Sequence, residues 1–414
     1  MTAFPVDWIR TQFPALSRQE HGRPVAYFDG PAGSQVPQSV ANAVSRYLLT
    51  TNSNRGGVFT VAQESDAIVD TAHQAAANLF GTNDPACTVF GANMTTLTLA
   101  VSRALARTWN TGDEVLVTRL DHDANVTPWI LAARDAGAIV KHVDVHLEDG
   151  TLDQTSFRNA LSSRTKLVAI GYASNVTGTI NPIAPMIAAA KAAGALTFID
   201  AVHYAPHGLI DVTALGCDFL ACSAYKFFGP HVGLLYGRRD LLEEITPYKL
   251  RVSSNQLPGK WMTGTQAHES LAGVSAAIRY LADMGRRCAS TDCERTALQS
   301  AFAAIRAYEQ TLSERMLAGL RSLGGYRVWG LTDAARIAER VPTFSLTHAR
   351  CTPKELAERL AAEGLYAWCG NHYGLPFTEA AGLEPHGTLR IGLLHYNTVE
   401  EVDRVLEALE RISV

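Results

Sequence analysis

Residues 195–202 read Ala-Leu-Thr-Phe-Ile-Asp-Ala-Val, and residues 217–226 read Cys-Asp-Phe-Leu-Ala-Cys-Ser-Ala-Tyr-Lys. Both contain a short, almost continuously apolar run, which is typical of a strand buried on both faces of a sheet. Asp200 ends the first run, and Lys226 follows the second. Ligands of parallel sheets bind at the edge where the strands end. We therefore expect Asp200 and Lys226 to lie together at one edge of a sheet.

Similar apolar runs flank these two stretches, and helical patterns lie between several of them. This alternation predicts the α/β class, with a mostly parallel sheet and helices on both faces. We expect strands at residues 88–90, 114–118, 138–145, 167–174, 195–202, 217–223 and 232–237, and helices at residues 127–136 and 185–193.

The last third of the chain has a different pattern, with two long helical stretches and then shorter elements. Thr398 and Glu401 form a capping-box pattern that opens a final helix. The pattern predicts a smaller α+β domain after a boundary in the Pro- and Gly-containing residues 248–264. The expected helices are residues 269–284, 295–323 and 353–363, and the expected strands are residues 341–347, 366–368 and 389–396. The predicted division is residues 1–25 (an N-terminal segment that packs with the small domain), 26–264 (the large domain) and 265–414 (the small C-terminal domain).

Composition narrows the class of protein. The 414 residues are 47% hydrophobic and carry a net charge of -4, which is ordinary for a globular protein. No basic region favours nucleic acid, and no apolar run is long enough to span a membrane. The start has no pattern of a secretory leader, and the seven cysteines form no Cys-x-x-Cys pair, so we expect a cytoplasmic, reducing location. We expect no metal, because Pro206 breaks the helix that His203 and His207 would need to bind one.

Asp200 and Lys226 suggest one kind of cofactor chemistry. A lysine at a dry sheet edge has a lowered pKa and can form a Schiff base with an aldehyde. Pyridoxal 5'-phosphate (PLP) needs such a lysine, and an acid against its pyridine nitrogen. Taken singly, an aspartate that ends a strand usually caps a turn, and a lysine in a loop is usually solvated. The prediction therefore depends on further segments in the right order.

Three further segments complete the pattern: residues 91–96 (Gly-Ala-Asn-Met-Thr-Thr), 120–125 (Leu-Asp-His-Asp-Ala-Asn) and 174–178 (Ser-Asn-Val-Thr-Gly). With residues 222–226, they resemble the class V aminotransferase family of PLP fold type I, in its cysteine-desulfurase-like branch. The resemblance runs from about residue 27 to residue 398. It implies a mostly parallel sheet of the seven-stranded type, a PLP cofactor and a small amino-acid substrate.

The resemblance also implies roles for single residues. Lys226 carries the cofactor, His122 stacks on its ring, and Asp200 holds its nitrogen; these three are the expected catalytic residues. The further cofactor-binding residues are Asn93, Met94 and Thr95 with Ser223 at the phosphate, Asn175 and His203 near the phenolic oxygen, and Thr265, which reaches the phosphate of a neighbouring subunit. Thr265 therefore implies a homodimer with shared active sites. Arg390 is expected to bind the substrate carboxylate, with Arg55, Asn175, His372 and Tyr373 also near the substrate. Without the family, the alternative for residues 93–95 is a simple helix cap.

The chain departs from the family at residues 368–374, Trp-Cys-Gly-Asn-His-Tyr-Gly. Alignment on Gly370 puts Tyr373 where desulfurases carry the cysteine that takes up sulfur, and Cys369 falls on the other side of the glycine. The sequence therefore favours a C–S lyase, which releases a thiol, pyruvate and ammonia from cysteine or a cysteine S-conjugate by β-elimination. His122, His372 or Tyr373 would protonate the sulfur. Alternatives are decarboxylating oxidative deamination, cysteine desulfuration, and an inactive scaffold. The unusual residues at the entrance hint at a substrate from secondary metabolism.

Overall fold

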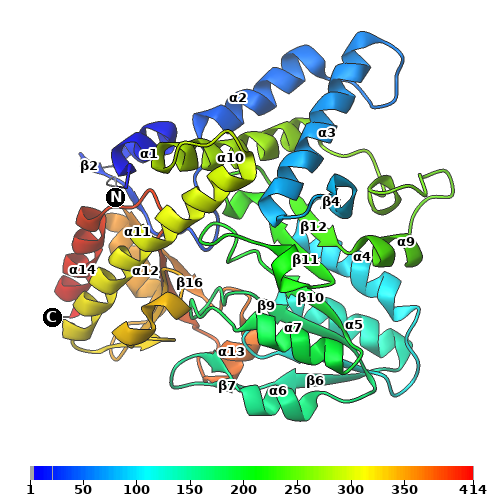
Figure 1. The fold of residues 1–414 in the computed structure, drawn as a ribbon. Helices are drawn as coiled ribbons and strands as arrows, with labels where there is room; N and C mark the ends of the chain where they lie inside the picture. Colours follow the sequence, from blue (N-terminus) through cyan, green and yellow to red (C-terminus); the bar gives the residue numbers. More distant parts are fainter. Residues whose placement is uncertain (1–3, 21, 414) are drawn as a thin grey trace.

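The computed structural model describes residues 4–20 and 22–413. Its centre is a seven-stranded sheet (Figure 1). Strand β12 runs antiparallel to both of its neighbours, and the other strands are parallel to one another. The predicted mostly parallel α/β sheet is thus confirmed. The strand order is β4 (Thr88–Gly91), β12 (Gly233–Gly237), β11 (Phe219–Ser223), β10 (Leu196–Asp200), β9 (Thr165–Gly171), β5 (Glu114–Thr118) and β6 (Ile139–Val143).

Helices cover both faces of this sheet (Figure 1). In β5, Leu116 enters the core on one face, whereas Val115 and Val117 enter the core on the other. Successive side chains of a strand point to opposite faces, so a strand covered on both sides must be apolar throughout. The helices are α4 (Met94–Ala106) and α5 (Thr127–Ala136) on one face, and α3 (Thr60–Phe80), α7 (Ile183–Ala192) and α10 (His268–Cys288) on the other.

A second, four-stranded antiparallel sheet follows in the last third of the chain. The capping box opens the final helix as predicted: the Thr398 amide donates to Glu401 Oε2 (3.3 Å), and the Glu401 amide donates to Thr398 Oγ1 (3.2 Å). The strand order is β13 (Tyr326–Trp329), β14 (Thr343–His348), β17 (Thr388–Gly392) and β16 (Trp368–Gly370), and the helices beside it are α11 (Glu294–Ser322), α12 (Pro353–Ala362) and α14 (Val399–Ser413).

Two predicted strands of this part differ from the structure. The single strand expected at residues 366–368 is two short strands, because Tyr366 pairs with Tyr27 whereas Trp368 pairs with Arg390. Strand β15 (Leu365–Tyr366) therefore joins β3 (Ala26–Tyr27), and β16 joins the four-stranded sheet. The last strand ends at Gly392, four residues before the expected end.

The N-terminal segment contacts the C-terminal part of the chain, and both termini lie on that side of the molecule (Figure 1). Arg10 donates to the Tyr396 carbonyl (2.7 Å) and pairs with Glu401 (3.0 Å). Residues 1–3 and 21 of the predicted segment 1–25 lie outside the described residues, and the domain boundaries stay predictions.

No helix among the described residues is long and apolar enough to cross a membrane. The remaining α-helices and strands of the described residues are α1 (Val6–Gln12), α2 (Gln38–Arg46), α6 (Gln154–Ala160), α8 (Val212–Leu215), α9 (Arg239–Glu244), α13 (Leu375–Ala380), and the strand pairs β1 (Gln19–Glu20) with β2 (Arg23–Pro24) and β7 (Val145–His146) with β8 (Thr151–Leu152).

Candidate active site

The parallel strands of the large sheet deliver polar side chains to one edge. Asp200 is the last residue of β10, and Lys226 follows β11 after one short turn. Asp121 and His122 follow β5. These side chains line a cavity of about 460 Å³. The expected meeting of Asp200 and Lys226 at the sheet edge is therefore observed.

Most of the predicted site residues line this same cavity. They come from the large sheet, from the N-terminus of α4, and from the four-stranded sheet with its loop. The predicted residues in the cavity wall are Asn93, Met94, Thr95, His122, Asn175, Asp200, His203, Ser223, Lys226, His372, Tyr373 and Arg390. Arg55 and Thr265 are the two predicted site residues that do not line it.

Lys226 lies in the cavity wall, close to the cation of Arg390 and to the carboxylates of Asp200 and Asp29. Its ammonium donates to the carbonyl of Pro31, a residue that the sequence did not single out. Burial, with the nearby Arg390 cation, lowers the pKa of Lys226 to about 7, although Asp200 and Asp29 oppose the shift. A lysine with this pKa supplies an uncharged amine near neutral pH, which is what a covalent bond to an aldehyde requires.

Asp200 is buried against the same cavity. Its carboxylate accepts the amide of Val202 (2.9 Å). Burial raises the pKa of Asp200 to about 6. The Val202 amide and the charge of Lys226 favour the ionised carboxylate, but they do not cancel the effect of burial. A cation held against this carboxylate would stabilise it, and the protonated pyridine nitrogen of PLP is such a cation.

The imidazole of His122 has a defined proton position. Its Nδ1 accepts the amide of Ala124 (3.0 Å), so the neutral ring carries its proton on Nε2. Burial, with the cations of Lys226 and Arg390, lowers the pKa of His122 to about 4. His122 is therefore a neutral ring at physiological pH, and it lies nearly parallel to the ring of Tyr373 (centroids 5.3 Å apart, 18° between planes).

The N-terminus of α4 lies beside the cavity. The Met94 amide donates to Ser223 Oγ (3.0 Å), so the helix end and the hydroxyl lie together. Gly233 permits this close approach, because a Cβ there would meet the Asn93 backbone within 2.4 Å. Asn93 itself closes a capping box, accepting the Thr96 amide with its side chain (2.9 Å) and donating its own amide to Thr96 Oγ1 (3.3 Å). The helix-cap alternative thus describes Asn93 in this structure, while Met94, Thr95 and Ser223 fit a phosphate.

Asn175 joins the two parts of the molecule at the cavity. Its Nδ2 donates to the His372 carbonyl (2.7 Å), and its own carbonyl accepts Nη1 of Arg390 (2.9 Å). Its Oδ1 is buried without a hydrogen-bond partner among the described residues. A buried acceptor without a partner is costly, so this atom fits a site whose ligand brings a donor.

Arg390 is buried at the same junction. Burial lowers the pKa of Arg390 to about 9, so the guanidinium stays cationic at neutral pH. One of its nitrogens binds the Asn175 carbonyl. A guanidinium that faces a cavity with donors to spare suits a bidentate bond to a carboxylate.

The loop after β16 covers the site in a constrained conformation. His372 and Tyr373 both have a positive φ, at 57° and 59°, which non-glycine residues seldom adopt. Two carbonyls of the loop accept hydrogen bonds from outside it: the Asp123 amide donates to the Tyr373 carbonyl (2.7 Å), and Asn175 Nδ2 donates to the His372 carbonyl. Cys369 lies before the loop, inside β16, where it pairs with Leu389.

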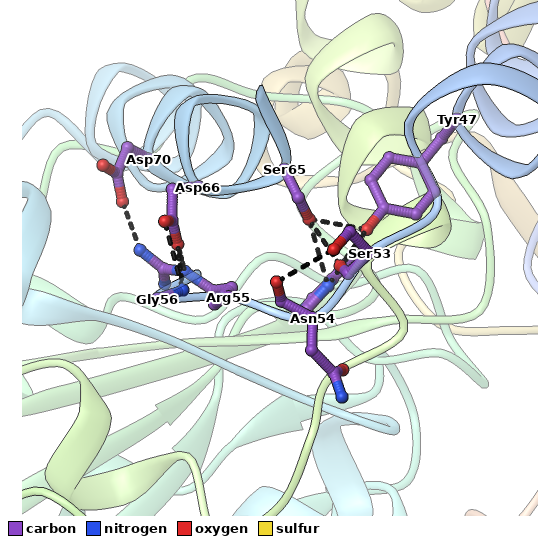
Figure 2. A network of polar contacts seen from close by, with 9 residues as sticks. Tyr47, Ser53, Asn54, Arg55, Gly56, Ser65, Asp66 and Asp70 are labelled. Carbon is purple, nitrogen blue, oxygen red and sulfur yellow. Dashed lines mark hydrogen bonds and ion pairs between the residues drawn. The ribbon is translucent and has the colours of Figure 1, made fainter. Parts of the chain in front are cut away.

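Arg55 lies outside the cavity and binds two carboxylates of α3. Its Nε donates to Asp66 and its Nη2 to Asp70, each at 2.8 Å. Figure 2 shows Arg55 turned toward these two side chains. Thr265 is exposed. The proximity of Arg55 and Thr265 to an active site therefore stays a prediction, and within one chain neither is in the cavity wall.

Asp121 is buried in the cavity wall, and it was not predicted as a site residue. Its carboxylate accepts the Gly171 amide (2.7 Å) and the Asn125 side chain (2.9 Å). Burial and the nearby Asp200 raise the pKa of Asp121 to about 7. The sequence signal that could have indicated Asp121 was an acidic residue directly before His122 and just after an apolar strand.

The described residues contain no group of three or more His, Cys, Asp or Glu side chains that could hold a metal ion.

The fold and the site together define an enzyme that uses pyridoxal 5'-phosphate. Lys226 would carry the cofactor, Asp200 would bind its ring nitrogen, and the end of α4 with Ser223 would bind its phosphate. The chain belongs to the class-V aminotransferase family, whose model matches residues 26–405, and to its cysteine-desulfurase-like branch.

Similar proteins carry two kinds of name. The chain is 28% identical to a cysteine desulfurase of Pectobacterium carotovorum, over 99% of this chain and 98% of that protein. It is 31% identical to the aminotransferase-like protein FGM3 of Gibberella zeae, over 99% of both chains. Among solved structures, the cysteine desulfurase CsdA of Escherichia coli is 26% identical, with a TM-score of 0.83 over 99% of this chain and 98% of that one. The apo cysteine desulfurase of Thermococcus onnurineus has a TM-score of 0.88 at 24% identity, over 100% of this chain and 99% of that one, which shows a shared fold.

Proposed function

We propose that this protein is a PLP-dependent C–S lyase that acts on cysteine or a cysteine S-conjugate. The observation that supports this proposal most directly is the loop at residues 370–374 over the cavity. Its Tyr373 stacks on His122, and it contains no cysteine. Cys369 is part of the β16–β17 ladder, which restricts its backbone. A desulfurase needs a thiol that can move to the substrate sulfur, whereas a lyase needs only a base and an acid.

The residues of the cavity divide the work of elimination. When bound, the cofactor withdraws electrons from the α-carbon of the amino acid joined to it. Arg390 binds the substrate carboxylate and so orients the α-carbon. Lys226, with its pKa near 7, is the base that takes the α-proton. Asp200 keeps the ring nitrogen protonated.

Tyr373 is the proposed acid that protonates the leaving sulfur. His122 has a pKa near 4, and burial lowers the pKa of His372 well below its ordinary value, so both rings are neutral at pH 7. His372 Nε2 also lies 3.2 Å from the carbonyl oxygen and from Oγ1 of Thr388.

The overall reaction balances. One conjugate and one water are consumed, and one thiol, one pyruvate and one ammonium are released.

A homodimer with shared active sites completes the proposal. Arg55 and Thr265 do not line the cavity of their own chain. In a homodimer, they would reach the cavity of the partner subunit instead. Several large apolar side chains close to Arg55 in the sequence are exposed, a feature typical of protein–protein contacts. They are Leu48, Leu49, Val58, Phe59 and Val61.

Cysteine desulfurase is the second candidate. Cys369 lines the cavity, and several relatives carry that name. A thiol in the wall of the site is the minimum that desulfuration requires. The two candidates differ in products, because desulfuration of cysteine gives alanine and a persulfide.

The test is product identification by mass spectrometry on the PLP-loaded protein, with free cysteine and a panel of S-alkylcysteine conjugates. The expected result is thiol and pyruvate from conjugates, with the same rate in Cys369→Ala. Cys351→Ala, a cysteine outside the cavity, is the matched control. Alanine with persulfide from cysteine, lost in Cys369→Ala, would overturn the lyase. Carbon dioxide release with oxygen uptake would instead indicate decarboxylating oxidative deamination.

A further inference from the structure

His203 lines the cavity three residues after Asp200, and one side of its ring is tied to the other part of the molecule. Its Nε2 lies 3.0 Å from Oγ1 of Thr343, the first residue of β14. Among the described residues, no hydrogen bond reaches the other ring nitrogen, Nδ1. Both side chains are buried. The Thr343 hydroxyl can donate to Nε2 or accept its proton, so the direction of this bond is coupled to which nitrogen of His203 carries the proton.

A second pair of buried side chains stands behind His203. Nδ1 of His207 lies 2.8 Å from Oε2 of Glu309 on α11, and each side chain is only 4% exposed. The rings of His203 and His207 meet edge to face, with centroids 5.7 Å apart and 73° between planes. The bond to Glu309 fixes the His207 ring, and the His207 ring in turn limits rotation of His203.

The surroundings of His203 disfavour a second proton on its ring. Burial, with positive charge on its neighbours, lowers the pKa of His203 well below its ordinary value. If the Thr343 hydroxyl donates to Nε2, the single proton of the neutral ring must sit on Nδ1. Titratable and charged groups surround His203 and the pair behind it on several elements. Among the described residues they include His207, Arg390, Lys226, His122, Glu309, Arg306 and His395, with Tyr204 and Arg340 in the small pocket that His207 and Glu309 line.

We propose that Thr343 and the His207–Glu309 pair are positioning residues that hold His203 as a neutral imidazole, with its proton on Nδ1 as a donor to the aromatic oxygen of the cofactor. Thr343 selects the protonated nitrogen, and Glu309 acts through His207 to fix the plane of the ring. This inference rests on the cofactor and is independent of which bond of the substrate is broken. A wrong assignment of the lyase reaction would leave it standing.

The first test measures the pH at which the visible absorption of the bound cofactor changes. A donor to the aromatic oxygen takes up part of its negative charge, so the nitrogen that joins Lys226 to the cofactor holds its proton less tightly. Loss of the donor raises this midpoint, by about 0.5 to 1 pH unit for one neutral hydrogen bond. Thr343→Val should show the rise and Thr343→Ser the wild-type midpoint. Thr347→Val is the control, because Thr347 lies on the same strand as Thr343 but its hydroxyl accepts Nε1 of Trp329 on β13 (3.1 Å).

The second test reads the proton position directly. The PLP-loaded protein is labelled with ¹⁵N-histidine, and His203 is assigned by the signal missing from His203→Gln. The expected spectrum has the His203 proton on Nδ1 in the wild type, and a mixture of Nδ1 and Nε2 forms in Thr343→Val. A His203 proton on Nε2 in the wild type would overturn the proposal, and so would a folded Thr343→Val with the wild-type midpoint.

The role of Glu309 is tested by a matched pair on α11. Glu309→Gln keeps an acceptor for His207 and should keep the wild-type midpoint, whereas Glu309→Ala removes it and should raise the midpoint. Glu314→Ala, an exposed position on the same helix, is the control. A folded Glu309→Ala protein with the wild-type midpoint would show that the His207–Glu309 pair does not position His203. If Glu309→Ala does not fold, a Glu309→Gln midpoint raised as far as that of Thr343→Val would contradict the proposed role of the hydrogen bond, because Gln keeps an acceptor for His207.

Discussion

At the scale of single residues, burial gives Lys226 its chemistry. Its pKa near 7 predicts that the cofactor-free protein reacts with PLP at a rate that rises with pH and levels off above about pH 7, because only the uncharged amine attacks the aldehyde. A solvated lysine would keep gaining rate up to about pH 10. Stopped-flow absorbance over this range measures the profile. Lys226→Arg should show no covalent binding, and a wild-type rate still rising above about pH 9 would contradict the buried amine.

Single site residues were predictable where they follow a strand. Asp200 and Lys226 were singled out because one ends an apolar run and the other follows one, and parallel strands end at one edge. His122 was assigned through the resemblance to the family. Asp121 was missed because an acid beside a histidine gives no sign of which side chain faces the cavity. The His203–Thr343 bond could not be predicted, since 140 residues separate the partners and only the packing of β14 against the large sheet brings them together.

At the scale of elements, the conformation of the loop at residues 370–374 depends on Gly387, just before β17. Gly387 has a φ of 64°, and a Cβ there would lie 2.0 Å from the Gly370 backbone. Gly387→Ala should therefore displace the loop, destabilise the protein by about 2 kcal/mol or more, and raise KM. Gly382→Ala is the matched control, because Gly382 has a φ of 66° and open space around its Cβ position. Urea unfolding and steady-state kinetics measure both, and equal losses would contradict contact with the loop.

Long, regular elements were the most predictable. The expected strand at residues 114–118 and the expected helix at residues 127–136 match β5 and α5 to the residue. Their patterns are local, because a run of apolar residues or a helical periodicity needs no distant partner. Strands β15 and β16 were merged in the prediction because two- and three-residue strands are defined by their partners, β3 and β17, and not by their own sequence.

At the scale of the whole molecule, the seven-stranded sheet was predictable, but the arrangement of subunits is not visible in one chain. The apolar runs and the motif order predicted the sheet correctly. Arg55 was predicted near the substrate, yet in one chain it is bound to Asp66 and Asp70 (Figure 2). The prediction and the observed ion pairs agree if Arg55 acts in the cavity of a partner subunit. A substrate carboxylate would there compete with these exposed ion pairs, which contribute little free energy in solvent.

Shared sites predict complementation between two inactive variants. Lys226→Ala removes the base of its own cavity, and Arg55→Ala would remove a substrate contact from the cavity of its partner. In a hybrid dimer, one cavity then combines an intact Lys226 with an intact Arg55 from the other subunit. Random assortment of equal amounts puts half of the chains in hybrids with one working site each, so about a quarter of wild-type activity should return. Co-expression with two different affinity tags and purification on both tags isolates the hybrid, which should then have about half of the wild-type activity per chain. If Arg55 acts in its own cavity, or if the protein is monomeric by light scattering, mixing restores nothing, because no single chain then carries both residues.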